Sequence, residues 1–444
     1  KEIDIVDGTA IKFFVSNSNF FSNLICGDKN GLEFVGNSLL IDDFTIVNFV
    51  IHNGSGYLVF SYGHVCQPSL IISLATLKFY LLDKSTRMPH GPNGKIKINE
   101  IIYKLSRHLA TYKDLLASYL SDTPNGKPTL LLRSKHIGHS LWNELSALEH
   151  LFKNNTEFRI APLSGTELYD KVENLFEGSI VQRFNSLGEL ISDCYKNNSP
   201  PIRYNESRIP STLVDRIVSR TLDENTDAER AHISIAVGMR CENRYPINYI
   251  DFIVLLAEKL VEKTNLNIHL LIDGHNVDGD KSIRSINQGT IDIEEREIEF
   301  FNKLTLKVNA SPQSSRIVLV KNIGFSITVA LKKLSECSFF VAPWGAGLVK
   351  YKWLLNQKGI VLTNSWNLVK RWDLGIYDFD KYRENQIPSH YLPSEYVEDD
   401  FNYYPPIHHG GDPSKVCFNI DLFKAVEFTT GVLYKTLLPL KGKD

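Results

Sequence analysis

The sequence predicts an α/β protein of two domains that is preceded by a β-rich segment. The chain has 444 residues, which is enough for two or three domains that each bury their own core. Short apolar strands alternate with amphipathic helices in both halves, as in parallel sheets covered by helices. A polar stretch rich in Pro, Ser and Asn, residues 197–211, separates the two halves.

The composition is that of an ordinary folded protein. Forty-nine Lys and Arg residues face 51 Asp and Glu residues, so the formal net charge of −2 argues against a strongly basic nucleic-acid binder. No apolar run approaches the roughly 20 residues that span a bilayer, and residues 1–15 do not resemble a signal peptide. Six scattered cysteines without a C-x-x-C pair favour a reducing compartment. We expect a cytoplasmic protein, compatible with a peripheral position at the inner membrane, and no nucleic-acid partner.

The first half begins with alternating apolar and polar residues up to about residue 83, which indicate a hairpin-rich sheet. Strands are expected at residues 11–21, 32–41, 44–52 and 56–63. The pattern then changes to helical spacing at residues 101–120. A wholly apolar strand at 129–134, a helix at 136–152 and a further strand at 158–163 form a strand–helix–strand unit.

The second half alternates strands and helices more regularly, which predicts a Rossmann-like doubly wound sheet. Five strands separated by helices are expected at residues 231–239, 267–274, 316–322, 338–347 and 359–365. A boundary near residues 212–230 divides the chain into a first domain (1–215) and a second domain (216–415). Residues 416–444 are expected to contain a helix that crosses back to the first domain.

The sharpest motif of the second half is a glycine turn, Trp344 to Gly347, between a buried strand and a predicted helix. Small residues let backbone N–H groups approach an anion, and a helix N-terminus adds a partial positive charge. Diphosphate is the obvious ligand, although such glycines often serve only the turn. The turn does not read G-x-G-x-x-G, so a nicotinamide or flavin site is not indicated.

Two further loops follow strands of the same domain. Arg240 and Arg244 come directly after the first strand, where they can fork onto phosphate oxygens, or else form a solvated loop with Glu242. Asp273 ends the next strand, a usual place for a ribose or sugar contact, although a plain turn fits the residues equally well.

In the first half, the junction between the strand at 129–134 and the following helix carries His136, His139 and Glu144. His139 or Glu144 can act as a general base that takes a proton from an acceptor hydroxyl. The alternative is that these residues only cap the helix.

Residues 324–348, which read GFSITVALKKLSECSFFVAPWGAGL, resemble the donor half of GT-B glycosyltransferases. The block is most similar to bacterial capsule and lipopolysaccharide transferases and to family 61 glycosyltransferases, whose signature has G-A-G-L after such a strand. That family opens a helix of its first domain with H-x-x-H-x-L-x-x-E-L, which appears here at residues 136–145. The family commonly has His or Gly before G-A-G, whereas this chain has Pro343 and Trp344, so the substrate is not carried over.

The resemblance implies a GT-B-like fold, with two Rossmann-like domains facing a cleft. It implies a nucleotide-sugar donor on the second domain, a glycan or lipid-linked glycan acceptor on the first, and neither a cofactor nor a metal. Two D-x-D triplets, residues 278–280 and 378–380, are interpreted as chance. The expected catalytic residues are His139 and Glu144, with Arg133 and His136 on the acceptor side. The expected donor-binding residues are Arg240, Arg244, Asp273, Ser326, Trp344, Gly345, Ala346, Gly347 and Lys350.

The predicted activity is transfer of a sugar to a glycan hydroxyl during synthesis of a bacterial surface polysaccharide or lipopolysaccharide. Alternatives are a Kdo transferase with a CMP-Kdo donor and a retaining mechanism, a nucleotide-sugar epimerase, and a non-catalytic sugar-binding module. The sequence leaves the sugar, the nucleotide, the acceptor, the stereochemistry and the oligomeric state open.

Overall fold

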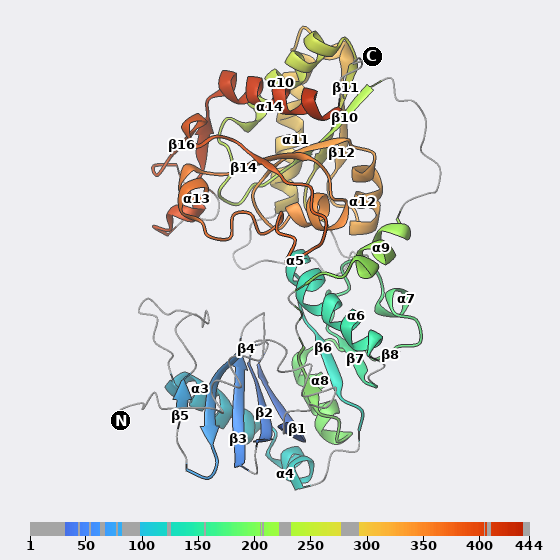
Figure 1. Cartoon of the computed structure of the whole chain (residues 1–444), viewed down its shortest axis with the longest axis vertical. Coiled ribbons are helices and arrows are strands. Elements are labelled where there is room, and N and C mark those ends of the chain that lie inside the picture. Colours follow the sequence, from blue (N-terminus) through green and yellow to red (C-terminus); the bar gives the residue numbers. More distant parts are fainter. Residues whose placement is uncertain are drawn as a thin grey trace. The chain divides into compact units, whose positions relative to one another are not determined.

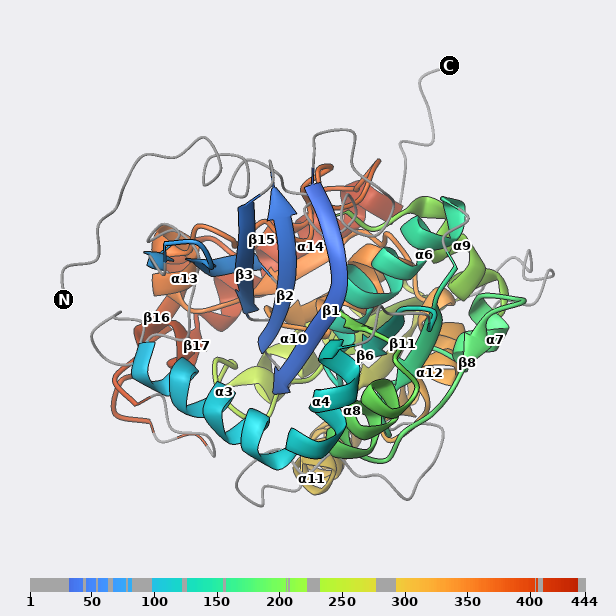
Figure 2. The ribbon, with the colours of Figure 1, turned by 90° about the horizontal axis from the view of Figure 1, so that it is seen from below.

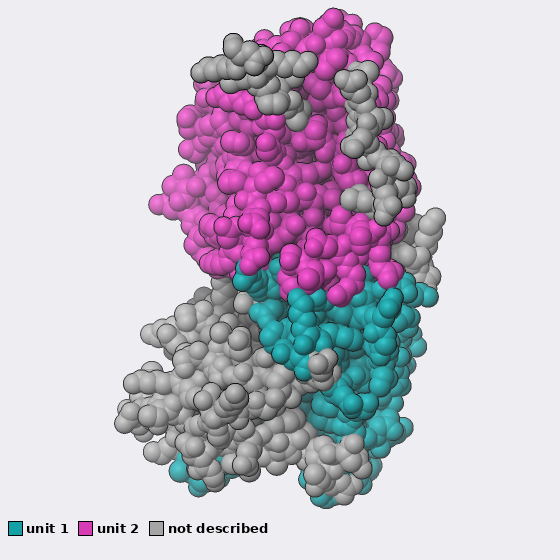
Figure 3. All heavy atoms as spheres, turned by 45° about the vertical axis from the view of Figure 1, so that its right-hand side comes forward, with its two compact units in different colours: residues 1–167, 171–209 teal, residues 168–170, 210–444 magenta. Residues whose placement is uncertain are grey.

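The chain folds into two compact units, which Figure 3 distinguishes by colour. Unit 1 consists of Lys1–Glu167 and Lys171–Ile209, and unit 2 of Leu168–Asp170 and Pro210–Asp444. The division after Ile209 lies just before the boundary expected from the sequence. The computed structural model describes residues 32–42, 45–52, 55–62, 67–76, 79–81, 98–121, 126–154, 157–204, 206, 208–221, 232–276, 293–403, 405 and 410–437.

The first described part of unit 1 is an antiparallel sheet of five strands in sequential order, which confirms the β-rich start. The first three of these strands lie side by side in Figure 2. The strands are β1 (Leu32–Asp42), β2 (Thr45–His52), β3 (Ser55–Tyr62), β4 (Gln67–Ser73) and β5 (Phe79–Leu81). The strand expected at 11–21 lies outside the described residues. Helices α3 (Ile98–Thr111) and α4 (Lys113–Ser121) follow, and Lys104 forms a 3.0 Å ion pair with Asp42 at the end of β1.

The second sheet of unit 1 is parallel, with the strand order β8-β7-β6-β9. It consists of β6 (Thr129–Leu132), β7 (Arg159–Pro162), β8 (Ile180–Val181) and β9 (Pro201–Ile202). All four residues of β6 are buried, as the apolar run predicts. The helices are α5 (Ile137–His139), the π-helical segment η1 (Ser140–Leu145), α6 (Ser146–Lys153), α7 (Val172–Leu175) and α8 (Leu187–Lys196).

Unit 2 is built on a six-stranded parallel sheet with the order β12-β11-β10-β13-β14-β15 (Figure 1). The strands are β10 (His232–Gly238), β11 (Asn267–Asp273), β12 (Ile317–Asn322), β13 (Phe339–Pro343), β14 (Gly359–Leu362) and β15 (His390–Tyr391). Counted from β10, this is the order 3-2-1-4-5-6 of a doubly wound sheet, so the α/β fold class is confirmed. The two-residue strand β15 adds a sixth strand to the five expected.

Unit 2 contains the helices expected between its strands and one at Ser365–Lys370 that the sequence analysis did not predict. They are α9 (Ser211–Ser219), α10 (Tyr249–Thr264), α11 (Ile293–Asn309), α12 (Ile327–Ser335), the π-helical segment η3 (Val349–Leu354), α13 (Ser365–Lys370) and α14 (Leu422–Leu437). Shorter elements are η2 (Ser314–Arg316), η4 (Ser394–Tyr396), β16 (Val397–Asp399), η5 (Pro413–Lys415) and β17 (Phe418–Ile420). No helix in the described part of the chain combines the length and the apolar character needed to cross a membrane.

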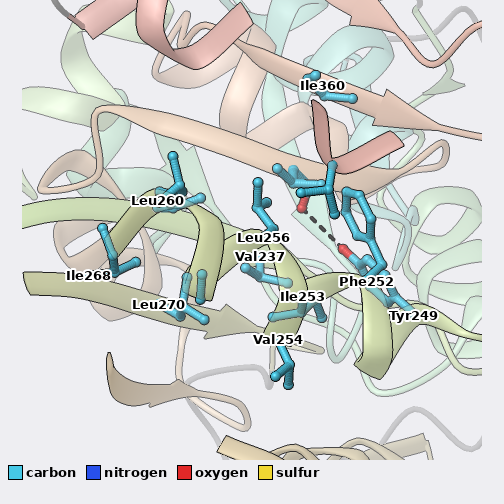
Figure 4. Close-up of a cluster of buried hydrophobic side chains, with 14 of the residues drawn as sticks. Val237, Tyr249, Phe252, Ile253, Val254, Leu256, Leu260, Ile268, Leu270 and Ile360 are labelled. Atoms are coloured by element: carbon cyan, nitrogen blue, oxygen red, sulfur yellow. Dashed lines mark hydrogen bonds between the residues drawn. The ribbon is translucent and has the colours of Figure 1, made fainter. Parts of the chain in front are cut away.

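The C-terminal helix differs from the prediction, because α14 belongs to unit 2 and packs against α10. Figure 1 shows α14 in red beside α10. Ala425, Val426 and Leu433 of α14 join the same hydrophobic core as the β-sheet residues of this unit. Figure 4 shows the centre of this core, where α10 residues such as Leu256 pack against the β10 residue Val237. The apolar face of α14 is therefore covered within its own unit, in place of the expected crossing.

Candidate functional site

The strand order of unit 2 reverses between β10 and β13, which lie side by side in the sheet. The chain proceeds outward from β10 to β12 on one side and then returns to build β13 on the other. In open α/β sheets, ligands bind at the carboxyl ends of the strands at this reversal. Gly238 ends β10 there, and a Cβ atom at this position would lie 2.7 Å from Cβ of Ala342 on β13. The loops after β10 and β13 consequently begin close together.

Arg240, in the loop after β10, reaches the glycine turn after β13. Its Nε donates to the carbonyl of Asn243 at 2.8 Å, and Glu242 lies 3.8 Å from the same nitrogen. A Cβ atom at Gly345 would overlap Nη1 of Arg240, so the guanidinium fills the space that the glycine leaves. The structure therefore brings together Arg240 and Gly345, which the sequence analysis had selected from separate motifs.

The glycine turn itself presents backbone donors. Within the described part of the chain, no acceptor takes the N–H groups of Gly345, Ala346 or Gly347, and a Cβ atom at Gly347 would meet open space. The expected long helix after the turn is instead η3, a six-residue π-helical segment. The turn thus offers N–H groups to an anion, without the dipole of a long α-helix.

Trp344 is held by contacts within unit 2, and its donor-binding role stays a prediction. Its ring is buried, and its Nε1 donates to the carbonyl of Leu374 at 2.9 Å. The guanidinium carbons of Arg371 and Arg244 lie 3.9 and 5.0 Å from the ring centroid. Trp344 therefore serves as a platform for two arginines, one of which, Arg371, the sequence analysis missed.

Asp273 and Lys350 form a buried network, and donor contact by either residue stays a prediction. Their charged atoms are 2.7 Å apart, and the two side chains are 2 % and 3 % exposed. The Lys350 ammonium also donates to the carbonyl of Gly274 and to Oδ1 of Asn276. Asp273 accepts a further hydrogen bond from Tyr351. Because all three ammonium protons have protein partners, Lys350 ties the end of β11 to η3.

Ser326 acts as the N-cap of α12, where its hydroxyl accepts the N–H of Val329 at 3.4 Å. This is the ordinary role of Ser at a helix start. The position lies beyond the carboxyl end of β12, and a donor-binding role for Ser326 stays a prediction.

Glu297 of α11 is a buried carboxyl near these loops that the sequence analysis did not select. Its Oε2 accepts the backbone N–H of His275 at 2.7 Å, and Gly274 leaves room for the same oxygen. Burial raises the pKa of Glu297 to about 8, although the His275 hydrogen bond and Lys350 counteract this. Glu297 lies inside a helix whose charged residues look like a solvated face in sequence, so only the fold reveals it.

The strand order of unit 1 reverses in the same way between β6 and β9. Glu144, in η1, reaches back to the end of β6, where its carboxylate accepts the N–H groups of Arg133 and Ser134 at 3.1 to 3.3 Å. Burial raises the pKa of Glu144, and Arg133 and the two N–H groups partly offset the rise. Glu144 therefore fixes the turn after β6, and its oxygens are already engaged.

His139 is placed differently, because its ring nitrogen Nδ1 lies 2.8 Å from Oδ1 of Asn143. Asn143 is oriented by its Nδ2, which donates to the carbonyl of Glu206 at 3.5 Å. An amide oxygen only accepts, so Nδ1 carries the proton and Nε2 is the basic nitrogen of the neutral ring. Burial lowers the pKa of His139, partly offset by Asn143 and reinforced by Arg133. His136 caps α5, accepting the N–H of His139 on its Nδ1.

The two carboxylates of the D-x-D triplet at residues 378–380 are engaged by other residues of the protein. Asp378 of the triplet at 378–380 accepts hydrogen bonds from Ser389 and Tyr391 and pairs with Lys352. Asp380 accepts the N–H of Gln386. The triplet at 278–280 lies outside the described residues.

Comparisons with known proteins found similarity to solved structures only, since no protein-family model and no curated protein matches the chain. E. coli ADP-heptose LPS heptosyltransferase II aligns over 69 % of this chain and 99 % of its own, with 10 % identity and a TM-score of 0.38. TibC, an iron-containing dodecameric glycosyltransferase from enterotoxigenic E. coli, aligns over 91 % and 95 %, with 9 % identity and a TM-score of 0.35. Methanocaldococcus jannaschii UDP-GlcNAc 2-epimerase aligns over 51 % and 64 %, with 11 % identity and a TM-score of 0.20. At these identities and TM-scores, the likenesses do not assign an activity to this chain.

Proposed function

We propose that the protein is a glycosyltransferase that moves a sugar from a nucleotide-sugar donor to a hydroxyl of a glycan or lipid-linked glycan acceptor. We place this reaction in the synthesis of a bacterial surface polysaccharide or lipopolysaccharide. The observation that supports it best is the cluster at the strand-order reversal of unit 2. There, Arg240 lies against Gly345 beside backbone N–H groups that no described residue accepts. Such groups suit the phosphates of a departing nucleotide.

In the proposed reaction, the acceptor oxygen attacks the anomeric carbon and the bond from this carbon to the donor phosphate breaks. The phosphate leaves with the bonding electrons, and guanidinium and N–H groups stabilise the developing negative charge without a metal. His139 takes the acceptor's proton on Nε2, because Asn143 holds the other nitrogen protonated. Glu144, the second candidate base, holds the turn after β6 instead.

The first experiment measures the thermal unfolding of the protein in the presence of UDP-, GDP-, CMP- and dTDP-sugars. A donor at about 100 times its dissociation constant should stabilise the protein by about 2.7 kcal/mol. Arg240→Ala should weaken binding of the selected donor by about 1.5–3 kcal/mol in calorimetry, as expected for a hydrogen bond to a charged group. Lys370→Ala, which removes an exposed charge on α13, is the matched control.

Turnover then distinguishes transfer from the alternatives. A transferase releases nucleotide rapidly only when an acceptor is present, whereas an epimerase converts the donor without one. A sugar-binding module binds the donor and releases no nucleotide. Selection of a CMP-linked donor would favour a Kdo transferase, and failure of every nucleotide sugar to bind would contradict the proposed function.

A further inference from the structure

Two guanidinium groups share the indole of Trp344, and the indole is held in place from two sides. Its Nε1 donates to the carbonyl of Leu374, and its backbone N–H donates to the carbonyl of Leu362 at 2.7 Å. Arg371 lies 3.9 Å from the ring centroid and Arg244 lies 5.0 Å from it, both within the range of a cation–π interaction. The ring therefore holds two positive charges near each other at the carboxyl end of β13.

The negative charges nearby do not balance these arginines. Arg371 pairs with Asp373 at 2.8 Å, and Arg240 has Glu242 at 3.8 Å. Arg244 has no carboxylate within 4 Å and donates no guanidinium hydrogen bond to any residue the structure describes. Burial lowers the pKa of Arg244 to about 9, and the charges of Arg240 and Arg371 add to this effect. An arginine in these surroundings is stabilised by an anion.

Arg244 has two unfavourable local features, an unpartnered side-chain donor and a strained backbone. Its Nε is buried without a hydrogen-bond partner among the described residues, which is unfavourable for a polar group. Its backbone has a φ of 56°, in the left-handed region that bulky residues avoid. Strain of this kind occurs at ligand-binding positions. The unpartnered donor and the strained backbone occur in one residue, whose guanidinium faces the same ring as that of Arg371.

Arg371 retains donors after it pairs with Asp373. Asp373 accepts a hydrogen bond from Nη2 at 3.3 Å, and its other carboxylate oxygen lies 2.8 Å from Nε, which makes no hydrogen bond to a described residue. The N–H groups of Nη1 have no acceptor among the described residues. Pairing with one edge of the guanidinium while the plane stacks on Trp344 fixes the direction of the remaining N–H groups. Asp373 is thus a positioning residue for Arg371.

We propose that Arg244 and Arg371, held on Trp344, form an anion site that binds a phosphate group of the donor, so that Arg371 is a donor-binding residue. This inference rests on the proposed function for the identity of the ligand, but the anion site itself can be tested without a sugar. A tetrahedral phosphate has enough acceptor oxygens to take hydrogen bonds from both guanidinium groups.

The test measures binding of inorganic pyrophosphate to the full chain by calorimetry. We expect Arg371→Ala and Arg244→Ala each to weaken binding at least about tenfold, the lower limit for a hydrogen bond to a charged group. Lys370→Ala, which removes the neighbouring exposed charge, should change the affinity for pyrophosphate less than twofold. Arg371→Lys keeps the charge but loses the planar stacking, so it should recover only part of the affinity. Pyrophosphate should also change the tryptophan fluorescence of the wild-type chain, and Trp344→Phe should abolish this change.

The outcomes separate the two proposals. If pyrophosphate does not bind, or binds equally well to both arginine variants and wild type, the anion site is wrong, even if nucleotide-sugar turnover is found. If pyrophosphate binding depends on both arginines but no nucleotide sugar binds or turns over, the anion site stands and the proposed function fails. If Arg371→Ala does not fold, Arg371→Lys and Asp373→Asn still test the anion site. The proposal would be overturned if both of these variants bound pyrophosphate with the affinity and the fluorescence change of the wild-type chain.

Discussion

At His139, the proposed chemistry depends on which ring nitrogen carries the proton. Asn143 fixes the proton on Nδ1, and burial lowers the pKa, so the ring is neutral above about pH 6.5 and can accept a proton. His139→Ala should therefore bind the donor normally but lose at least about 100-fold in turnover. In the wild type, kcat/KM should fall only as the pH drops below about 6.5, because protonation removes the base.

Two variants test this assignment. Asn143→Ala should lower turnover less than His139→Ala, since it removes only the partner that orients the ring. Glu144→Gln should mainly destabilise the turn after β6, because its carboxylate holds two backbone N–H groups. If Glu144→Gln abolishes turnover in a folded protein while His139→Ala keeps it, the roles are reversed.

The pair of Asp273 and Lys350 leads to a prediction about stability and not about donor binding. Lys350→Met leaves the Asp273 carboxylate buried without its ammonium partner, which should lower the free energy of unfolding by about 3–5 kcal/mol. The double variant with Asp273→Asn should cost less than the sum of the two single changes. Urea unfolding measures both. A Lys350→Met protein with wild-type stability and lost donor affinity would restore the donor-binding assignment.

At the scale of the elements, burial decides what the sequence can predict. Strands β10, β11 and β13 were recognisable because their buried residues form continuous apolar runs. Helix α10 lies between β10 and β11, where the alternation of strands and helices predicts a helix. The strands β8, β9 and β15 have two residues each, which is too short for any periodicity. Helix α8 was missed, although Ser186 caps it.

The π-helical segments η1 and η3 were predicted as ordinary helices. Their apolar spacing resembles that of an α-helix, and the extra residue per turn has no sequence signature. In η1, the widened turn accompanies a tertiary contact, the hydrogen bonds of Glu144 to the end of β6. π-helical turns are frequent at functional sites, and both follow strands at a strand-order reversal.

The candidate site was partly predictable because the buried strands that precede it are recognisable in the sequence. Arg240 and the glycines at 345 and 347 follow directly after buried strands, where a doubly wound sheet places its ligands. Arg371 and Glu297 come from α13 and α11 regions with no local motif. Only the fold brings Arg371 to the turn after β13 and Glu297 to the loop after β11. Sequence position alone also could not show that Asp273 and Lys350 neutralise each other.

The packing of α14 on α10 gives a prediction for this element. Leu433 is fully buried in the core of unit 2, so Leu433→Ala should lower the free energy of unfolding by about 2–5 kcal/mol. Phe423 lies on the same helix, but its side chain is 79 % exposed. Phe423→Ala should therefore change the free energy of unfolding by less than about 0.5 kcal/mol. Urea unfolding of both variants is the measurement. Equal stabilities would mean that α14 does not depend on this core.

For the whole molecule, two compact units imply that unfolding need not be a single transition. Unit 1 contains a group that makes its stability depend on pH. His108 is buried in α3, with its Nε2 2.8 Å from the Tyr195 hydroxyl, and burial lowers its pKa to about 4. Ring contacts with Tyr112 and Tyr195 surround it. The folded unit therefore holds this ring neutral at pH values where the unfolded chain protonates it.

The sign of the effect follows from proton binding. Between about pH 6.5 and pH 4, the unfolded chain binds a proton at His108 that the folded unit does not bind, so stability falls as the pH falls. With one pKa unit worth 1.36 kcal/mol, the loss should reach about 2 kcal/mol by pH 5. His108→Gln should lack this component, and subtracting its pH profile from that of the wild type removes the carboxylates common to both. Urea unfolding of unit 1, followed by hydrogen exchange of its β6 amides, measures the difference. Parallel profiles for the two proteins would show that His108 titrates alike in the folded and unfolded states, and that its burial contributes nothing to acid unfolding.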